Sequence, residues 1–207
     1  MLHMIRGCQV PEPSLLFEGF QRTESGFLAN VHAERIDPLF RAFLERQEEE
    51  LFFFLELPTN QAEEKKLRDA WSAAGNKGEM PLHKDVYYWD GIGKDEAFAL
   101  LDRYGELLIQ DGMASFGFGN RSFSAELMKG KYNVLTLYAK DKEAYAGFFP
   151  AFGLREYEDL PTAWDTFTRE APGYSGTVKA AGLSVYELPE LLREKGLYFA
   201  ERREEQG

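Results

Sequence analysis

The segment Leu51-Phe-Phe-Phe-Leu-Glu-Leu57 constrains the fold of this chain more than any other, because Glu56 is its one polar residue. Side chains alternate between the two faces of a β-strand, so a run of apolar residues is apolar on both faces. Such a run is typical of a central strand that is covered on each side, and Pro58 ends it. The segment therefore predicts a layered fold with this strand inside a sheet.

Helix signals lie around this strand. Asp37-Pro38 predicts a helix start, with Asp37 as N-cap and Pro38 at the first helical position. Asn60 followed by Glu63 predicts a second start with a capping box. The segment 94–110 has the clearest helical periodicity in the chain. The helix from Asn60 is expected to bury the stripe Leu67, Ala70, Trp71 and Ala74.

Further strands are expected over 85–89, 113–118 and 132–139. The strands centred near 54, 87 and 116 are spaced by about 30 residues with a helix in each gap, which is typical of parallel β-α-β units. The N-terminal strands and the strand at 132–139 lack such long helical connections. The prediction is an α+β fold, or a mixed α/β fold, with a mixed, partly antiparallel sheet and helices packed on it.

The length predicts one globular domain over 1–207, with 151–207 as a C-terminal subregion where the pattern weakens. The ends, residues 1–13 and 201–207, are expected to be poorly ordered. Cys8 is the single cysteine, and no continuous apolar segment near the N-terminus predicts a signal peptide. These features predict a cytoplasmic protein.

The charge balance restricts the partners. The chain has 35 acidic and 24 basic residues, a net charge of −11, and its basic residues are scattered. Binding to nucleic acids or to anionic membranes depends on clustered Lys and Arg, so neither partner is expected. A basic protein is compatible with this charge.

The segment after residue 113 has part of a dinucleotide-binding layout. Gly117, Gly119 and Asn120 follow a strand, and Asp141 ends the next one, as in a motif that binds pyrophosphate and ribose. Ser122 stands where the third glycine would be, and 124–129 is too short for a crossover helix. The alternative is a strand in which the glycines permit a bulge or a close contact.

A second group of candidates surrounds the strand at 85–89. His83 and Asp85 share a strand face, and Asp90 begins the loop 90–95, so these three are the first residues to test for catalysis. The loop lacks the residues of a phosphate loop, because Tyr88 and Asp95 stand at two of its defining positions. No metal site and no cofactor is predicted, since the other two histidines lie far upstream.

The aromatic cluster Tyr87-Tyr88-Trp89 has two interpretations, because consecutive aromatics on a strand are either covered on both faces or exposed on one. An exposed aromatic patch ringed by carboxylates would bind protein. The favoured hypothesis is a non-catalytic module that neutralises a basic protein, as an antitoxin or immunity protein does. The alternatives are a small-molecule or nucleotide-binding protein or enzyme that uses loops 90–95 and 117–122, and a homo-oligomer that buries its aromatic surface.

Overall fold

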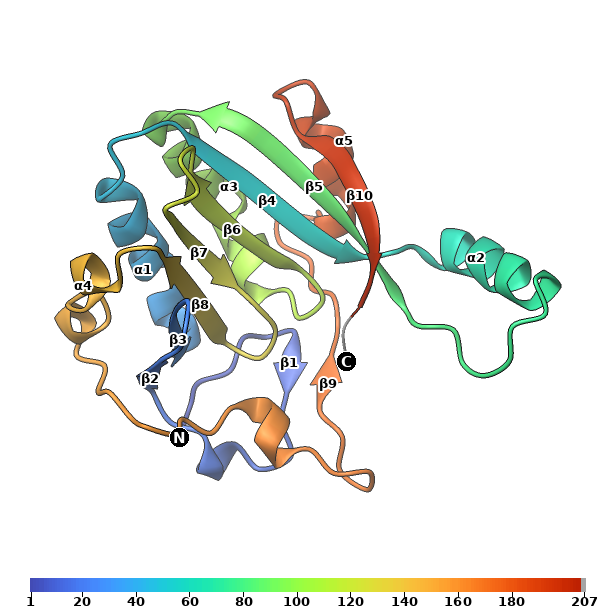
Figure 1. The fold of residues 1–207 in the computed structure, drawn as a ribbon, viewed down its shortest axis with the longest axis horizontal. Helices are drawn as coiled ribbons and strands as arrows, with labels where there is room; N and C mark the ends of the chain where they lie inside the picture. Colours follow the sequence, from blue (N-terminus) through green and yellow to red (C-terminus); the bar gives the residue numbers. More distant parts are fainter. Residues whose placement is uncertain (206–207) are drawn as a thin grey trace.

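The computed structural model describes residues 1–205, and its centre is an eight-stranded sheet in which every neighbouring pair of strands is antiparallel (Figure 1). The strand order is β10-β5-β4-β6-β7-β8-β3-β2, and a separate two-stranded sheet joins β1 to β9. The strand bounds are β1 Cys8–Gln9, β2 Gly19–Arg22, β3 Gly26–Asn30, β4 Leu51–Pro58, β5 His83–Ile92, β6 Ser115–Asn120, β7 Ala125–Lys129, β8 Val134–Ala139, β9 Tyr174–Ser175 and β10 Tyr198–Glu204. The helices are α1 Ala33–Glu45, α2 Gln61–Ala73, α3 Lys94–Gln110, α4 Lys142–Tyr145 and α5 Leu188–Arg193.

The predicted fold class is confirmed: helices pack on a sheet in a mixed helix and strand fold. The expectation of parallel β-α-β units is wrong, because neighbouring strands in this sheet are antiparallel. β5 and β6 both pair antiparallel with β4 and lie on either side of it, so α3 connects two strands that run in the same direction without touching. A spacing of strand, helix and strand cannot reveal that a third strand lies between the two.

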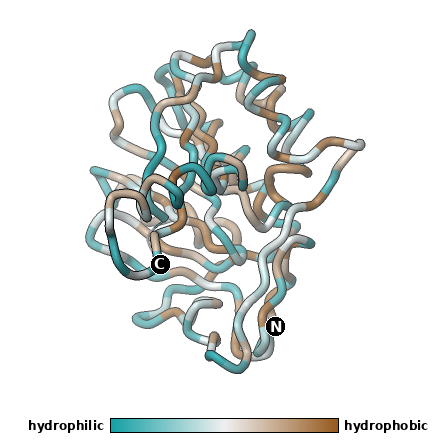
Figure 2. The backbone as a smooth tube through the Cα atoms, turned by 90° about the vertical axis from the view of Figure 1, so that its right-hand side faces the viewer, coloured by the Kyte–Doolittle hydropathy of each residue, from teal (hydrophilic) through white to brown (hydrophobic). Residues whose placement is uncertain are grey.

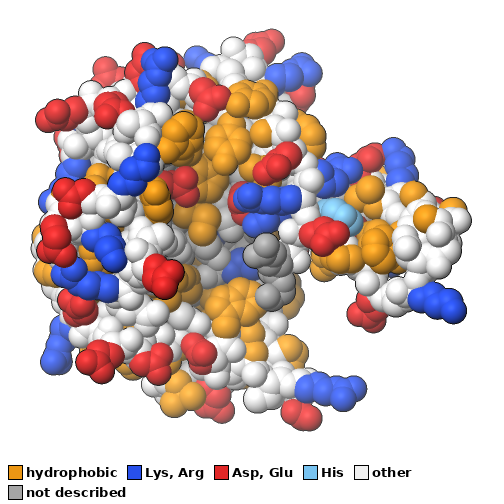
Figure 3. Space-filling view, in the orientation of Figure 1, with side chains coloured by type: hydrophobic (Ala, Val, Ile, Leu, Met, Phe, Trp, Pro, Cys, Tyr) orange, Lys and Arg blue, Asp and Glu red, His pale blue; other side chains and the backbone are white. Residues whose placement is uncertain are grey.

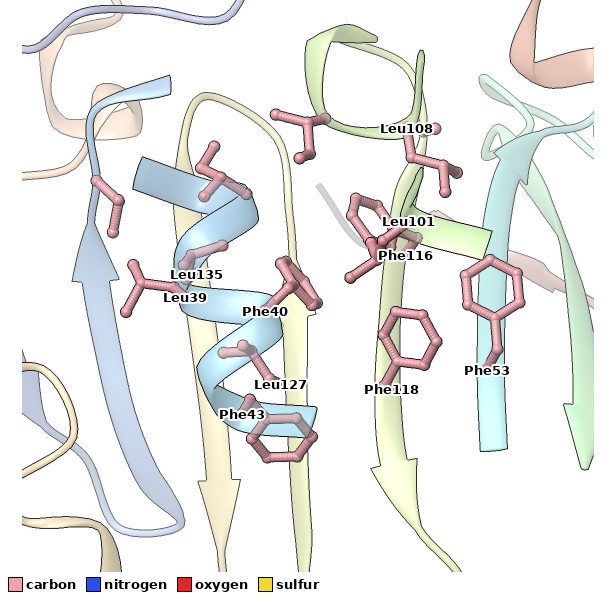
Figure 4. Close-up of a cluster of buried hydrophobic side chains, with 14 of the residues drawn as sticks. Leu39, Phe40, Phe43, Phe53, Leu101, Leu108, Phe116, Phe118, Leu127 and Leu135 are labelled. Atoms are coloured by element: carbon pink, nitrogen blue, oxygen red, sulfur yellow. The ribbon is translucent and has the colours of Figure 1, made fainter. Parts of the chain in front are cut away.

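One face of the sheet forms the hydrophobic core together with α1 and α3 (Figure 4). Phe40 of α1 stacks on Phe116 of β6 with 4.7 Å between ring centroids, and Phe53 of β4 lies 5.2 Å from Phe118. Hydrophobic stretches are spread through the chain trace, and hydrophilic stretches are frequent in its outer loops (Figure 2). The segment Leu51 to Leu57 is therefore central and buried on both faces, as its sequence predicts.

The first helix begins earlier than predicted, at Ala33, and Pro38 lies inside it. Proline removes one intrahelical donor, but the turns that follow bury Leu39, Phe40 and Phe43, and this packing favours continuing the helix. Asp37 accepts a 2.7 Å bond from Arg41 Nε instead of capping the helix.

The second helix starts at the predicted cap but does not pack as expected. Asn60 accepts a 3.0 Å bond from the backbone N–H of Glu63, yet α2 projects away from the body of the molecule (Figure 1). Of the helix residues only Glu64 is buried, so the expected burial of Leu67, Ala70, Trp71 and Ala74 is wrong. The linear pattern could not show that β4, β5 and β10 extend beyond the core and hold this helix outside it.

An Asn60→Ala variant is expected to loosen α2 without unfolding the sheet. Loss of an N-cap costs about 1 kcal/mol of helix stability, and little packing opposes the fraying of α2. Hydrogen exchange of the amides in 61–73 should accelerate about fivefold, while the amides of β4 and β6 keep their protection. Equal acceleration in both places would contradict this and would show that α2 unfolds together with the core.

Both ends of the chain are more ordered than predicted. Leu2, Ile5 and Cys8 are buried, β1 pairs with β9, and residues 201–204 belong to β10. The expectation of poor order at both ends is therefore wrong for the described residues. Gln206 and Gly207, which belong to the predicted tail, lie outside the described residues.

The C-terminal part of the chain lies at both edges of the sheet. Beyond β2, Phe20 N–H donates to the carbonyl of Arg155 and Tyr157 N–H donates to the carbonyl of Phe20. β10 forms the opposite edge. Within residues 1–205, no helix has the length and apolarity that a bilayer crossing requires.

Candidate functional site

The sheet face opposite α1 and α3 has a group of aromatic rings that come from three parts of the chain; Phe123 is exposed, Tyr88 is half-buried, and Phe52 and Phe54 are buried. Phe52 lies 5.9 Å from Tyr88 and 5.1 Å from Phe123, and Phe54 lies 6.1 Å from Tyr88, between ring centroids. We call Phe52, Phe54, Tyr88 and Phe123 the aromatic shelf. Apolar side chains gather on this face among acidic and basic ones (Figure 3).

Two glycines create the space that the shelf occupies. Gly119 pairs with Phe52 and Gly117 pairs with Phe54 across β4 and β6. A Cβ atom at Gly119 would lie 2.2 Å from Cζ of Phe52, and one at Gly117 would lie 2.5 Å from the ring of Phe54. The rings therefore lie over the bare backbone of β6, which is a known use of glycine inside a strand. This is why three consecutive Phe residues fit: Phe53 enters the core and its neighbours cover the glycines.

Phe123 completes the shelf from the turn between β6 and β7. Its φ of 51° lies in the left-handed region, which is unfavourable for a residue with a bulky side chain. Its ring is 62% exposed although it contacts Phe52. A large apolar residue that is both exposed and held in an unfavourable conformation is a feature of functional surfaces.

Charged side chains border the shelf, and their pairing is uneven. Glu56 of β4 is buried and binds two cations, Lys84 Nζ at 2.6 Å and the Arg203 guanidinium. Glu126 of β7 lies directly opposite Gly119 and therefore close to the ring of Phe52. Among the described residues, no hydrogen bond or ion pair reaches its side chain. The Glu56 carboxylate is thus neutralised by two cations, whereas the Glu126 carboxylate has no bonded cation among the described residues.

The environment of Glu126 alters proton binding. Burial raises the pKa of Glu126, the charge of Glu56 raises it further, and Arg203 partly opposes both. Burial also raises the pKa of the Tyr88 hydroxyl, and the charge of Glu126 adds to that effect. Glu126 and Tyr88 therefore influence each other across the shelf.

A pocket of about 480 Å³ adjoins the shelf. It combines ends of β4 and β5 with the turn after β6, and its apolar wall includes two members of the shelf. The lining residues are Glu50, Leu51, Phe52, Asp90, Gly91, Arg121 and Phe123. Residues of the loops 90–95 and 117–122 thus meet around one hollow.

The structure separates the three residues first proposed for catalysis. His83 Nδ1 lies 3.3 Å from both carboxylate oxygens of Glu64, and Asp85 accepts hydrogen bonds from Thr59 and Arg202. Both face the side of α1 and α3, as their spacing predicts. Asp90 lies on the shelf side, where Tyr198 donates to it at 2.6 Å. It is five residues from Asp85, about 16 Å along a strand, so the three do not form one cluster.

The residues of the incomplete dinucleotide motif are also placed apart. Gly117 and Gly119 lie inside β6, and 124–129, which is too short for a crossover helix, contains the strand β7. The side-chain oxygen of Asn120 accepts from the N–H groups of Ser124 and Ala125, so it organises the β6–β7 turn. Asp141 caps α4 by accepting from Glu143 and Ala144.

The aromatic triplet is divided between the two faces of β5. Tyr88 belongs to the shelf, whereas Trp89 is buried in the core. Tyr87 packs edge to face on Phe199, 5.7 Å between centroids, and lines a cleft of about 750 Å³ beside α5. This larger cleft contains Asp85, but its carboxylate is already bound by Thr59 and Arg202.

Sequence reasoning did not identify Phe123, Glu126 or Arg203 as site residues. All three are distant in sequence from Phe52, Phe54 and Tyr88, and the pairing of strands brings them to the same sheet face. The sequence contained a signal only for the contact between β4 and β6: Phe-x-Phe at 52–54 and Gly-x-Gly at 117–119 both repeat every two residues, as side chains on one face of a strand do.

Neither a protein-family model nor a curated protein nor a solved structure matches this chain. Within residues 1–205, no group of three or more His, Cys, Asp or Glu side chains is arranged to hold a metal ion. The candidate site therefore rests on its own geometry.

Proposed function

We propose that this protein is a non-catalytic binding module that neutralises a basic protein partner by covering it with the aromatic shelf. The observation that carries the proposal is the shelf itself, on the sheet face opposite α1 and α3: Phe123 is exposed and Tyr88 is half-buried, and both contact the buried ring of Phe52. Aromatic residues supply most hot spots of protein interfaces.

The charges around the shelf support a basic partner. The side chains of Glu56, Asp90, Glu126 and Glu201 belong to the strands β4, β5, β7 and β10 on this face, together with Lys84 and Arg203. Carboxylates outnumber cations there, and the whole chain has a net charge of −11. Complementary charge speeds association and makes binding sensitive to salt.

Capture from a native lysate tests this function with two matched aromatic variants. Phe123→Asn removes the exposed ring, and Asn tolerates the left-handed φ of 51° at this position. Tyr174→Ala, with a side chain 59% exposed on β9, is the control. The wild type and the control should retain one basic protein stoichiometrically at low salt, and Phe123→Asn should bind it about tenfold more weakly, a typical loss for an interface anchor.

The outcome that contradicts the proposal is specific. If the captured protein is acidic, if 0.5 M NaCl does not weaken its binding, or if both variants retain it equally, the shelf is not the site for a basic partner.

The pocket of about 480 Å³ beside the shelf favours a second candidate, a small-molecule site formed by the loops 90–95 and 117–122. Asp90 and Arg121 would supply its polar contacts and Phe52 its apolar wall. A thermal-shift screen of nucleotides and common metabolites tests it, because a ligand at 100 times its Kd stabilises a protein by about 2.7 kcal/mol. Stabilisation that disappears in Arg121→Ala would favour this site over the protein-binding role.

A further inference from the structure

The most unusual charged group on the shelf side is Glu126. It is half-buried and lies opposite Gly119, over which the ring of Phe52 extends. Arg203, the cation whose charge acts on Glu126, is bound to Glu56, as is Lys84. Glu126 is therefore an ionisable group with little solvent and, among residues 1–205, without a bonded counter-ion.

A carboxylate in this position has a cost in the free protein. Partial burial disfavours its charged form, and the neighbouring charge of Glu56 adds to this, which is why its pKa is raised. The positive charge of a cation delivered by a ligand would offset both penalties. The partly exposed ring of Tyr88 on the same sheet face would also contact the carbon and nitrogen atoms of a planar cation.

We propose that Glu126 and the aromatic shelf receive an arginine side chain of the basic partner. The guanidinium would donate two hydrogen bonds to the Glu126 carboxylate and stack on the partly exposed ring of Tyr88. This inference rests on the proposed function and specifies the anchor group that the partner inserts.

Arginine fits this site better than lysine for two reasons. Its planar guanidinium matches a carboxylate with two parallel bonds, and it stacks on aromatic rings. It is also more weakly hydrated than an ammonium group, so it loses less on entering a half-buried site. The lysine ammonium would satisfy the charge of Glu126 but would leave the ring of Tyr88 without a stacking partner.

The test uses N-acetyl-L-argininamide as the probe, titrated into the full-length protein at pH 7 and low salt. The carbon-13 signal of the Glu126 side-chain carboxyl and the ring signals of Phe52 and Tyr88 report on binding. All three should shift together and saturate. The dissociation constant should be about fivefold weaker for N-acetyl-L-lysinamide, because stacking and paired hydrogen bonds are lost.

Glu126→Gln is the test variant, and Glu24→Gln, at an exposed residue in the turn between β2 and β3, is the matched control. Gln is isosteric and removes a carboxylate that is costly to bury, so the variant should melt at or above the temperature of the wild type. Glu126→Gln should weaken binding of the arginine probe about fivefold or more, whereas Glu24→Gln should not change it. Unchanged binding in Glu126→Gln, or shifts absent from all three signals, would overturn the inference.

Failure of this inference is distinguishable from failure of the proposed function. If Phe123→Asn abolishes capture of the basic partner while Glu126→Gln alters neither capture nor probe binding, the shelf binds its partner without an arginine at Glu126. If neither variant alters capture, the shelf is not the partner site, and both proposals are rejected.

Discussion

Raising the pH from 7 to 10 is expected to stabilise the wild-type protein by about 2.5 kcal/mol relative to a Lys129→Met variant. Lys129 is fully buried, and burial lowers the pKa of its amine to about 8. Between this value and the ordinary pKa of lysine, near 10.5, the unfolded chain holds a proton that the folded protein has released. Stability rises with pH wherever the unfolded state binds more protons.

The position of Lys129 explains why a buried amine persists. Its Nζ donates to the backbone carbonyls of Asp111 at 2.6 Å and Ala114 at 3.0 Å, where α3 leads into β6. The Asp111 carboxylate accepts from the N–H groups of Ala114 and Val178, so the same junction also holds the C-terminal segment. Below pH 8 the charged amine is retained at a cost, and that cost disappears as the amine loses its proton.

Urea unfolding of both proteins at pH 7, 8, 9 and 10 measures this effect as a difference in the free energy of unfolding. The comparison with the variant is needed because Cys8 also titrates in this range. Burial raises the pKa of the Cys8 thiol, so the folded protein keeps this proton at a pH where the unfolded chain has lost it, and stability falls as the pH rises. Cys8 is present in both proteins, so its contribution largely cancels. A difference that stays constant from pH 7 to pH 10 would show that Lys129 titrates normally.

Gly119→Ala is expected to destabilise the protein by about 1–3 kcal/mol, although it adds a single methyl group. That methyl would lie 2.2 Å from Cζ of Phe52, so the ring must leave the surface of β6. Gly147→Ala is the matched control, because a Cβ at Gly147 meets nothing within 4 Å. The control should change the free energy of unfolding by less than about 0.5 kcal/mol.

A double-mutant cycle identifies the cause of this loss. Phe52→Leu shortens the side chain over Gly119, so adding Gly119→Ala to it should cost at least about 1 kcal/mol less than in the wild type. Thermal or urea unfolding of the four proteins gives the coupling energy. Strict additivity would mean that Gly119 is needed for its backbone alone and that it does not hold the ring in place.

The most reliable predictions from sequence depended on short-range chemistry. The burial of Leu51 to Leu57 on both faces follows from consecutive apolar residues, and the start of α2 at Asn60 follows from a cap that bonds three residues ahead. The strand β7 was missed because Ala125 to Lys129 has a buried Lys129 where an apolar residue would complete the alternation. Pro38 suggested a helix start because its local preference was weighed without the tertiary packing of α1.

The candidate site could be predicted only in fragments. Tyr88, Gly117, Gly119 and Asp90 were singled out from sequence, and all four lie at or beside the shelf. Tyr88 was proposed for protein binding, as it is here, but Gly117, Gly119 and Asp90 were assigned to ligand binding or catalysis, because loops and motifs were considered without strand register. His83 and Asp85 were grouped with Asp90, but the strand continues through Ile92 and places Asp90 on the other face.

The sequence by itself determined that this chain has an apolar central strand, a long amphipathic helix at 94–110 and an acidic character. These properties depend on composition and on spacings within a few residues. Only the tertiary structure decided that Phe52 and Phe54 lie over Gly119 and Gly117, and that Glu126 comes beside them. Strand register is set by contacts between residues that are distant in the chain, and a shift of one residue would move every side chain to the opposite face.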